Sequence, residues 1–317
     1  MITKLIPTDD KKRKLFAVSS TVVISGLLTL WGIYGIGEYG IALFILTPIF
    51  IGAGSTILYG ISKGITKREA WLISRVTLAV FTIGLLVFAI EGLICIAMAA
   101  PFGLLLTWVG SLIGHAVLDR SPQNAPSVIL ILFCIIPSTA FIEKDIAPAL
   151  TSVVTSIEID APPNVVWKNV IEFPQLKEPT DFIFKTGIAY PINAKIVGKG
   201  VGSVRHCNFT TGSFVEPITV WDEAKLLKFD VVEQPAPMKE LSFWDIDAPH
   251  LHDYFVSKQG QFKLVALPND KTLLEGTTCY YHNIKPAAYW QLWSNYIIHK
   301  IHIRVLSHIK FNWENEK

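Results

Sequence analysis

The segment AFIEKDIAPALTSVVTSIEID, residues 140–160, contains the change in composition that decides the fold of this chain. Before Pro148, the stretch from Leu15 to Ile142 holds only nine charged side chains, and most of them fall between apolar runs. A water-soluble domain needs more charged and polar side chains than this to cover its surface. After Pro148 the charges return, with 17 Lys and Arg against 18 Asp and Glu. The sequence therefore predicts a membrane module followed by a globular domain.

The overall composition narrows the possible functions. The chain has 317 residues, 51% of them hydrophobic, a mean hydropathy of +0.42 and a net charge of +2. This length suits one membrane module and a domain of roughly 150 to 170 residues with its own core. Neither half has the basic stripe that nucleic-acid binding requires. The four cysteines show no CxxC or zinc-type spacing, so we expect no metal and no cofactor.

The first half contains five apolar runs of the length that a membrane span requires. A bilayer core calls for about 20 apolar residues per helix. We expect a basic N-terminus at 1–14, a module over 15–148 and a second domain over 149–317. Because Pro101 suits the first turn of a new helix, we place the turn before the fourth span near 97–101. The predicted spans are 15–36, 41–62, 70–95, 101–118 and 126–143.

The distribution of Lys and Arg predicts how the module is oriented. The cluster KKRK at 11–14 and the loop with Lys63, Lys67 and Arg68 are expected on the cytoplasmic side. Five spans from a cytoplasmic N-terminus place the second domain on the other side. The sequence thus predicts a multi-pass protein of a bacterial inner membrane, with its second domain outside the cytoplasm. The loss of one span would reverse this orientation.

Two ionisable residues and two glycine-rich stretches lie in or near the spans. Glu91 and His115 could form a polar spot for a lipid headgroup or a proton, because ionisable groups at membrane depth usually face a bundle interior. Alternatively, Glu91 lies near an interface and His115 is capped by a neighbouring helix. The stretches Gly52-Ala53-Gly54 and 110–114 indicate close helix packing rather than a transport site.

The second half has the pattern of a curved sheet covered by a helix. Residues 151–159 alternate like a strand, and Asp160-Ala161-Pro162-Pro163 opens a short helix that reaches Ile171. A long helix is expected from Pro286 to about Phe311. A meander of strands between two such helices implies an antiparallel sheet whose concave face needs covering. The expected strands of the meander are 193–199, 201–209, 213–221, 225–233, 252–266 and 272–282.

Three motifs in this half resemble the START-like, or SRPBCC, superfamily, which includes Bet v 1, polyketide cyclases and lipid-transfer proteins. They are IEIDAPPNVVWKNVIEFPQL at 157–176, VGKGVGSVRHCNF at 197–209 and LLEGTTCYYH at 273–282. The resemblance covers nearly all of 151–312 and implies a helix-grip fold, with an apolar cavity between the sheet and the terminal helix. It also implies a lipid, sterol or polyketide ligand, and it supplies no universal catalytic motif. The membrane module and a Pro-rich loop at 234–252 depart from typical members.

Polar residues for a ligand site are expected on the hairpin that follows residue 200. If its turn runs through Thr210-Thr211-Gly212, His206 faces Glu216, and Arg205 lies on the opposite face of the sheet. His206 and Glu216 could then act as acid and base or hold a ligand hydroxyl, or they could form an ordinary cross-strand pair. Arg205 could bind a carboxylate or phosphate, or form a surface ion pair. The full set predicted to contact a ligand is Arg205, His206, Glu216, Trp221, Tyr254, Tyr281, Trp290, Trp293 and Ile297.

Other features leave alternatives open. His250 with His252, and His299 with His302, have spacings from which a metal site could be drawn, but such spacings arise often by chance. The loop 234–252 could gate the cavity, dip into the membrane or simply pack on the sheet. The aromatic side chains of the terminal helix could close the cavity on one side and meet the membrane on the other.

These observations lead to three hypotheses for function. The first is a membrane-anchored START-like protein that binds a lipid or another apolar small molecule at the bilayer surface, in transfer or sensing. The second is a cyclase or hydrolase that acts on a lipid-like substrate through His206 and Glu216. The third is a docking or assembly factor without a catalytic role.

Overall fold

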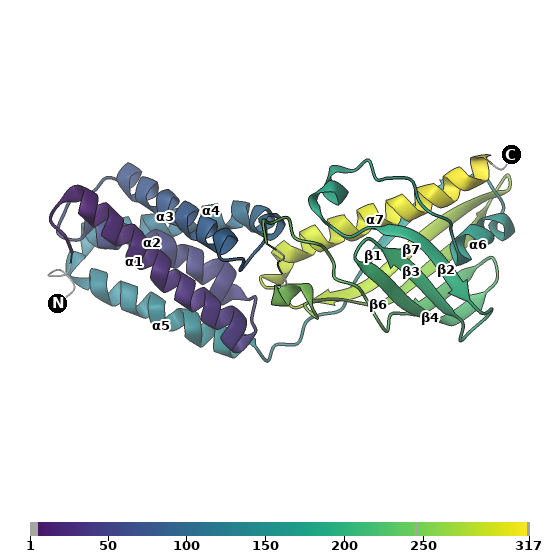
Figure 1. The fold of residues 1–317 in the computed structure, drawn as a ribbon, viewed down its shortest axis with the longest axis horizontal. Helices are drawn as coiled ribbons and strands as arrows, with labels where there is room; N and C mark the ends of the chain where they lie inside the picture. The colour runs from purple at the N-terminus through teal and green to yellow at the C-terminus, as the bar shows by residue number, and fades with distance from the viewer. Residues whose placement is uncertain (1–5, 245, 247, 316–317) are drawn as a thin grey trace. The chain divides into compact units, whose positions relative to one another are not determined.

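The structure, a computed structural model, describes residues 6–244, 246 and 248–315, with side chains as far as Phe311. The described chain forms two compact units (Figure 1). The helical unit runs to Ala147 and also includes two short later segments, Ser242–Pro249 and Ile284–Pro286. The sheet unit holds the remainder of the chain from Pro148 onward. The break in composition at Pro148 is therefore also a structural boundary.

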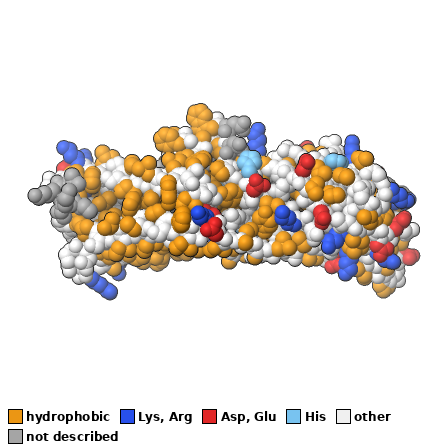
Figure 2. All heavy atoms as spheres, turned by 90° about the horizontal axis from the view of Figure 1, so that it is seen from below, with side chains coloured by type: hydrophobic (Ala, Val, Ile, Leu, Met, Phe, Trp, Pro, Cys, Tyr) orange, Lys and Arg blue, Asp and Glu red, His pale blue; other side chains and the backbone are white. Residues whose placement is uncertain are grey.

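Five helices of the described residues are long and apolar enough to cross a membrane, as the sequence predicted. Hydrophobic side chains spread over the surface of this unit, and few charged ones interrupt them (Figure 2). The five are α1 (Asp10–Leu30) with its π-helical extension η2 (Trp31–Ile36), η3 (Ala42–Leu46) with α2 (Thr47–Gly60), α3 (Lys67–Val87), α4 (Leu93–Arg120), and η4 (Pro122–Asn124) with α5 (Ala125–Glu143).

The turn between α3 and α4 differs from the prediction. It occupies residues 88–92 rather than 97–101, and Pro101 lies inside α4. Ala89 turns the chain with a φ of 54°, and Gly92 caps the start of α4. A proline is tolerated inside a membrane helix because local backbone adjustment and neighbouring helices satisfy the freed carbonyl. The residues of the turn are themselves apolar as far as Ile90, so hydropathy does not mark it.

Glycines bring α2 and α4 into close contact, which agrees with the packing role predicted for them. A Cβ atom on Gly52 would lie 2.2 Å from the carbonyl oxygen of Thr107. A Cβ atom on Gly110 would lie 2.2 Å from the carbonyl oxygen of Ile49. No side chain fits at either position, so the two backbones touch directly. The span that contains α2 is the most deeply buried of the five, because α2 also packs against α1, α3 and α5.

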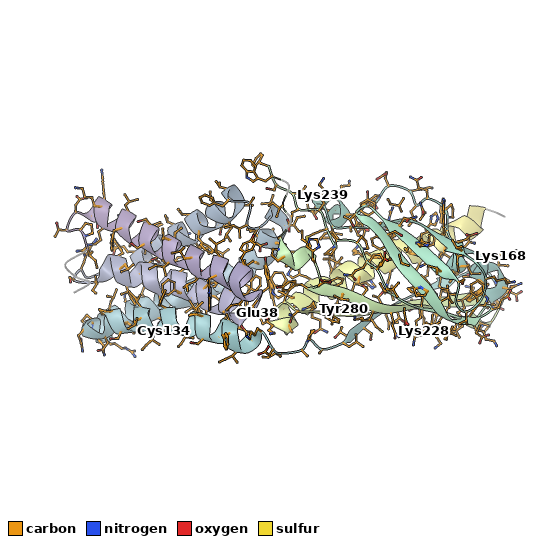
Figure 3. The ribbon with its side chains drawn as sticks, turned by 60° about the horizontal axis from the view of Figure 1, so that its bottom comes forward. Glu38, Cys134, Lys168, Lys228, Lys239 and Tyr280 are labelled. Atoms are coloured by element: carbon orange, nitrogen blue, oxygen red, sulfur yellow. The ribbon has the colours of Figure 1, made fainter. Side chains whose placement is uncertain are left out.

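The short segment Ile284–Pro286 is held inside the helical unit by hydrogen bonds and charge. The Lys285 backbone N–H donates to the Tyr39 carbonyl at 2.9 Å, and its ammonium donates to the Glu143 carbonyl at 2.7 Å. The same ammonium lies 3.9 Å from the Glu38 carboxylate, labelled in Figure 3. The Glu143 carboxylate accepts from the N–H groups of Ile41 and Ala42, which open the second span. Within the helical unit, the segment Ile284–Pro286 is thus fixed beside the C-terminal end of α5.

The sheet unit is a seven-stranded antiparallel sheet with two helices. The sheet order is β1-β7-β6-β5-β4-β3-β2, so the first strand pairs with the last. The helix α7 packs along β1 and β7, and α6 contacts α7, β6, β7 and β2. This arrangement is the helix grip that the resemblance implied. The elements are β1 (Thr151–Ile159), α6 (Pro163–Ile171), η5 (Phe182–Thr186), β2 (Pro191–Val197), β3 (Val204–Phe209), β4 (Gly212–Asp222), β5 (Leu226–Asp230), η6 (Pro249–Leu251), β6 (Phe255–Leu267), β7 (Lys271–His282) and α7 (Ala287–Asn315).

The core of the sheet unit lies between the strands and the two helices. It forms because α6 and the second half of α7 each present an apolar face at helical spacing, and the facing strands alternate apolar residues inward. All seven strands contribute to this one cluster. Its helical members are Val166, Trp167 and Val170 of α6 and Val305, Leu306 and Ile309 of α7.

The loop 234–252 packs in its first part and is exposed at residues 241–244. The Gln234 side chain donates to the Phe255 carbonyl and accepts from the Ser257 N–H. Met238 forms a β-bridge with Ile188. These contacts support the prediction of packing on the sheet for residues 234–240. Beyond them the apolar side chains at 241, 243 and 244 are exposed, so packing does not explain the whole loop.

Candidate ligand-binding site

The register of the β3–β4 hairpin differs by one residue from the prediction. Phe209 pairs with Gly212, so the turn consists of the two residues Thr210 and Thr211. Arg205 therefore faces Glu216, and His206 faces Val215. A shift of one residue moves every side chain of a strand to the other face of the sheet. The predicted His206–Glu216 pair is wrong, and an Arg205–Glu216 pair takes its place.

Arg205 and Glu216 form an ion pair in the interior of the sheet unit. Their side chains are 2% and 7% exposed, and Nη1 of Arg205 donates to Oε2 of Glu216. Nε of Arg205 donates to the Ile171 carbonyl at the end of α6, 3.2 Å away. Burial raises the pKa of the Glu216 carboxyl, and the charge of Arg205 opposes that rise. Within the described part of the chain, Nη2 of Arg205 has no hydrogen-bond acceptor.

Three phenylalanine rings surround the guanidinium of Arg205. Its central carbon lies 5.6 Å from the Phe173 ring centre, 5.4 Å from that of Phe229 and 5.5 Å from that of Phe262. A glycine makes room for one of them, because a Cβ atom on Gly260 would lie 2.4 Å from the Phe229 ring. Cations over aromatic faces are stabilised more strongly when water is excluded. The guanidinium is therefore surrounded by apolar rings, and its Nη2 has no acceptor among the described residues.

Cys207 lies on the same strand face as Arg205. Burial raises the pKa of its thiol to about 12, and the charge of Glu216 contributes in the same direction. The thiol therefore stays protonated at neutral pH and is a poor nucleophile. Acid–base catalysis by the predicted pair is also unsupported, because His206 and Glu216 point to opposite faces of the sheet. This arrangement suits binding better than covalent or proton-transfer chemistry.

The other residues predicted to contact a ligand lie in different parts of the sheet unit. Trp221 packs edge-on against Trp167, with ring centres 5.7 Å apart, beside the core. Trp290 is buried, and Trp293 and Ile297 of α7 are half-buried, as is Tyr254 before β6. Tyr281 has Lys258 5.4 Å above its ring, and Lys258 is exposed. Tyr281 therefore lies on the face of the sheet opposite its buried neighbour Tyr280.

The tyrosine that does face α7 is the neighbour of Tyr281. Tyr280 is fully buried, and its hydroxyl donates to Oδ1 of Asn295 at 2.7 Å (Figure 3 labels Tyr280). Gln291 of α7 donates to the hydroxyl of Thr151 at 3.0 Å. These hydrogen bonds continue along the helix and join the first half of α7 to β1 and β7. The sequence prediction did not include Tyr280, although the alternation of β7 would have placed it opposite Tyr281.

Two histidines of α7 continue this row of polar contacts. Nε2 of His302 lies 2.8 Å from the Thr278 hydroxyl, and its Nδ1 lies 3.1 Å from the Thr155 hydroxyl. Nδ1 of His299 lies 2.8 Å from the same Thr155 hydroxyl. Burial, together with the neighbouring His299, lowers the pKa of His302 to about 4. Both imidazoles therefore have hydrogen-bonding roles between the helix and the sheet.

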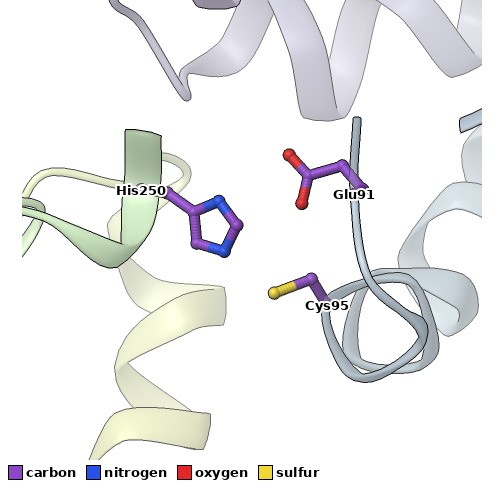
Figure 4. Close-up of side chains that lie close together, drawn as sticks. All are labelled: Glu91, Cys95 and His250. Atoms are coloured by element: carbon purple, nitrogen blue, oxygen red, sulfur yellow. The ribbon is translucent and has the colours of Figure 1, made fainter. Parts of the chain in front are cut away.

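The remaining ionisable residues considered from the sequence lie elsewhere. Glu91 is in the turn before α4, Cys95 is in the first turn of α4, and His250 is in η6 (Figure 4). His115 is half-buried within α4. His250 is buried, and its Nε2 lies 4.0 Å from the Glu240 carboxylate, whereas His252 is exposed. His250 and His252 therefore differ in surroundings although their spacing suggested a pair.

No protein-family model matches the chain, and no curated protein matches it. Among solved structures, norcoclaurine synthase from Thalictrum flavum is 12% identical, covering 55% of this chain and 100% of that one, with a TM-score of 0.36. An aromatase/cyclase from a Streptomyces species is also 12% identical, covering 52% and 94%, with a TM-score of 0.35. A protein from Nitrosospira multiformis is 19% identical, covering 53% and 100%, with a TM-score of 0.34. The strand order of the sheet unit and the packing of α7 along β1 and β7 are those of a helix grip.

Proposed function

We propose that this chain is a membrane-anchored helix-grip protein whose sheet unit binds an apolar or amphipathic ligand, such as a membrane lipid. The observation that carries the proposal is the unpaired Nη2 of Arg205 among three phenylalanine rings. Leaving a buried donor without a partner is costly. A ligand with an apolar body and one carbonyl, hydroxyl or acidic oxygen would satisfy that donor and remain in contact with the rings.

The binding mode follows from how the pair is placed. Glu216 neutralises Arg205, so the site does not require a fully ionised ligand, and one ligand oxygen can supply the acceptor that Nη2 lacks. Most of the affinity would come from apolar area, and Arg205 would fix which end of the ligand points inward. The five apolar helices of the first unit would keep this site close to a reservoir of lipids.

The hypothesis of an enzyme that uses His206 and Glu216 loses its catalytic pair, because the two residues lie on opposite faces of the sheet. A docking or assembly role requires no interior site. The binding proposal and the docking hypothesis are separated by whether the chain retains a ligand that depends on Arg205.

The test is lipid retention by the purified full chain after extensive detergent exchange, followed by extraction and mass spectrometry. The informative variant is Arg205→Met with Glu216→Leu, which removes both charges together. The matched control is His206→Ala on the outer face of the same strand. We expect the wild type and the control to retain one lipid-like molecule per chain, and the double variant to lose it while still folding. Equal retention by all three proteins, or by none, would reject the proposal.

A further inference from the structure

Exposed aromatic side chains gather at one end of the helical unit. Trp31 and Tyr34 lie at the end of α1 and in η2, Phe88 directly follows α3, and Phe141 lies near the end of α5. These positions share one end of the bundle, because successive spans run in opposite directions and α1, α3 and α5 therefore end together. Aromatic residues are enriched where a membrane helix passes through the headgroup region. This end of the bundle has the composition of a membrane interface.

If the five candidate spans cross a bilayer, everything after α5 lies on that same side of it. The five candidate spans of the described residues end with Glu143, and α7 is not among them. A chain that has crossed five times and does not cross again stays on the side where its fifth helix ends. The segment Ser242–Pro249, which belongs to the helical unit, is therefore on the side of the aromatic end.

The tip of the loop 234–252 carries three exposed apolar side chains. Leu241 is 45% exposed, Phe243 is fully exposed and Trp244 is 57% exposed. The apolar residues on the far side of the tip, Ile246 and Ala248, are buried. The loop is therefore anchored after the tip, and the exposure of Phe243 and Trp244 does not reflect a generally unpacked segment.

We propose that Leu241, Phe243 and Trp244, here called the loop tip, insert into the headgroup region of the same bilayer that α1–α5 span. The inference rests on the membrane-spanning part of the proposed function and is independent of ligand binding at Arg205. Phe243 and Trp244 of the loop tip share a compact unit with the five apolar helices, and Leu241 directly precedes that segment. Tryptophan suits this depth, because its ring is apolar and its indole N–H can meet headgroups.

The test places a genetically encoded fluorescent amino acid at position 243 of the full chain in phospholipid vesicles. The matched control places it at 182, because Phe182 is a similarly exposed phenylalanine, 79% exposed, in η5 of the sheet unit. Quenching is measured with lipids brominated on their acyl chains and, separately, with iodide in the water. We expect brominated lipid to quench the probe at 243 several-fold more than at 182, and iodide to show the reverse order.

Each other outcome overturns the inference. Equal iodide quenching at both positions, without quenching by brominated lipid, would mean that the loop tip lies in water. Protection of position 243 from both quenchers would mean that a protein, or a second copy of this chain, covers it. Release of the chain from vesicles by alkaline carbonate would reject the membrane-spanning part of the proposal. The quenching result does not depend on ligand binding, so a failure of ligand binding at Arg205 would reject only the ligand-binding proposal and would leave this inference standing.

Discussion

Removal of one partner from the Arg205–Glu216 pair should destabilise the sheet unit strongly. The change Glu216→Gln keeps the shape of the side chain and leaves the Arg205 charge buried, with 2% of its side chain exposed, and without a counter-charge. Breaking a buried ion pair in this way costs about 3–5 kcal/mol. For a domain of this size, each kcal/mol lowers the melting temperature by about 2–4 °C, so we expect a fall of roughly 6–20 °C.

The paired change, Arg205→Met with Glu216→Leu, should behave quite differently. Replacing a buried ion pair by apolar residues of similar volume is often neutral or stabilising by about 1–4 kcal/mol. We therefore expect the double variant to melt near the wild-type temperature, and clearly above Glu216→Gln. The near-ultraviolet circular dichroism of the full chain is a suitable probe, because the edge-on pair Trp167 and Trp221 lies beside this core.

The control is His206→Gln, which changes a side chain on the outer face of the same strand and should shift stability by no more than about 0.5 kcal/mol. The reasoning would be refuted if Glu216→Gln melted within about 2 °C of the wild type. It would also be refuted if the double variant were no more stable than the single one, because the loss would then come from packing rather than from an unpaired charge.

Three further predictions concern pH and close packing. The pKa of His302 is lowered to about 4, whereas a free imidazole titrates near 6.5. The stability that the neutral imidazole contributes, roughly 3 kcal/mol, is therefore complete above pH 6.5 and is lost as pH falls towards 4. His302→Gln should make the melting temperature less dependent on pH over this range, and an unchanged pH dependence would contradict the assignment. Gly52→Ala should impair folding of the helical unit, measured as monodisperse yield in detergent, because its Cβ would meet the Thr107 carbonyl, whereas Gly26→Ala should be tolerated in open space. Gly260→Ala should lower the melting temperature of the sheet unit, since its Cβ would displace the Phe229 ring, and a variant that melts like the wild type would show that the ring can move freely.

The sequence was sufficient for the order of elements but not for the register that builds the site. Alternation and turn residues predicted each strand and both helices of the sheet unit, because those signals are local. The β3–β4 turn was ambiguous, since Thr210-Thr211-Gly212 lacks the Asn-Gly or Asp-Gly pair that marks a two-residue turn. This uncertainty of one residue made His206 the predicted partner of Glu216, whereas the structure pairs Glu216 with Arg205.

Contacts between distant residues were beyond prediction for a different reason. Phe173 follows α6, whereas Phe229 and Phe262 lie in β5 and β6, and the folded sheet unit brings their rings around Arg205. The segment Ile284–Pro286 joins the helical unit through contacts with Tyr39 and Glu143. These residues are far apart in the sequence, so local patterns of composition do not reveal the contacts.

The most direct test of the proposed function is photocrosslinking with a diazirine-bearing phospholipid in vesicles that contain the full chain, followed by mapping of the labelled peptides. Lipids of the bilayer will label α1–α5 in any case, so the informative peptides are those of β5 and β6 that contain Phe229 and Phe262. We expect these peptides to be labelled in the wild type and in His206→Ala, and to lose the label in Arg205→Met with Glu216→Leu. Labelling confined to α1–α5 in all three proteins would contradict the proposal that the sheet unit binds a lipid.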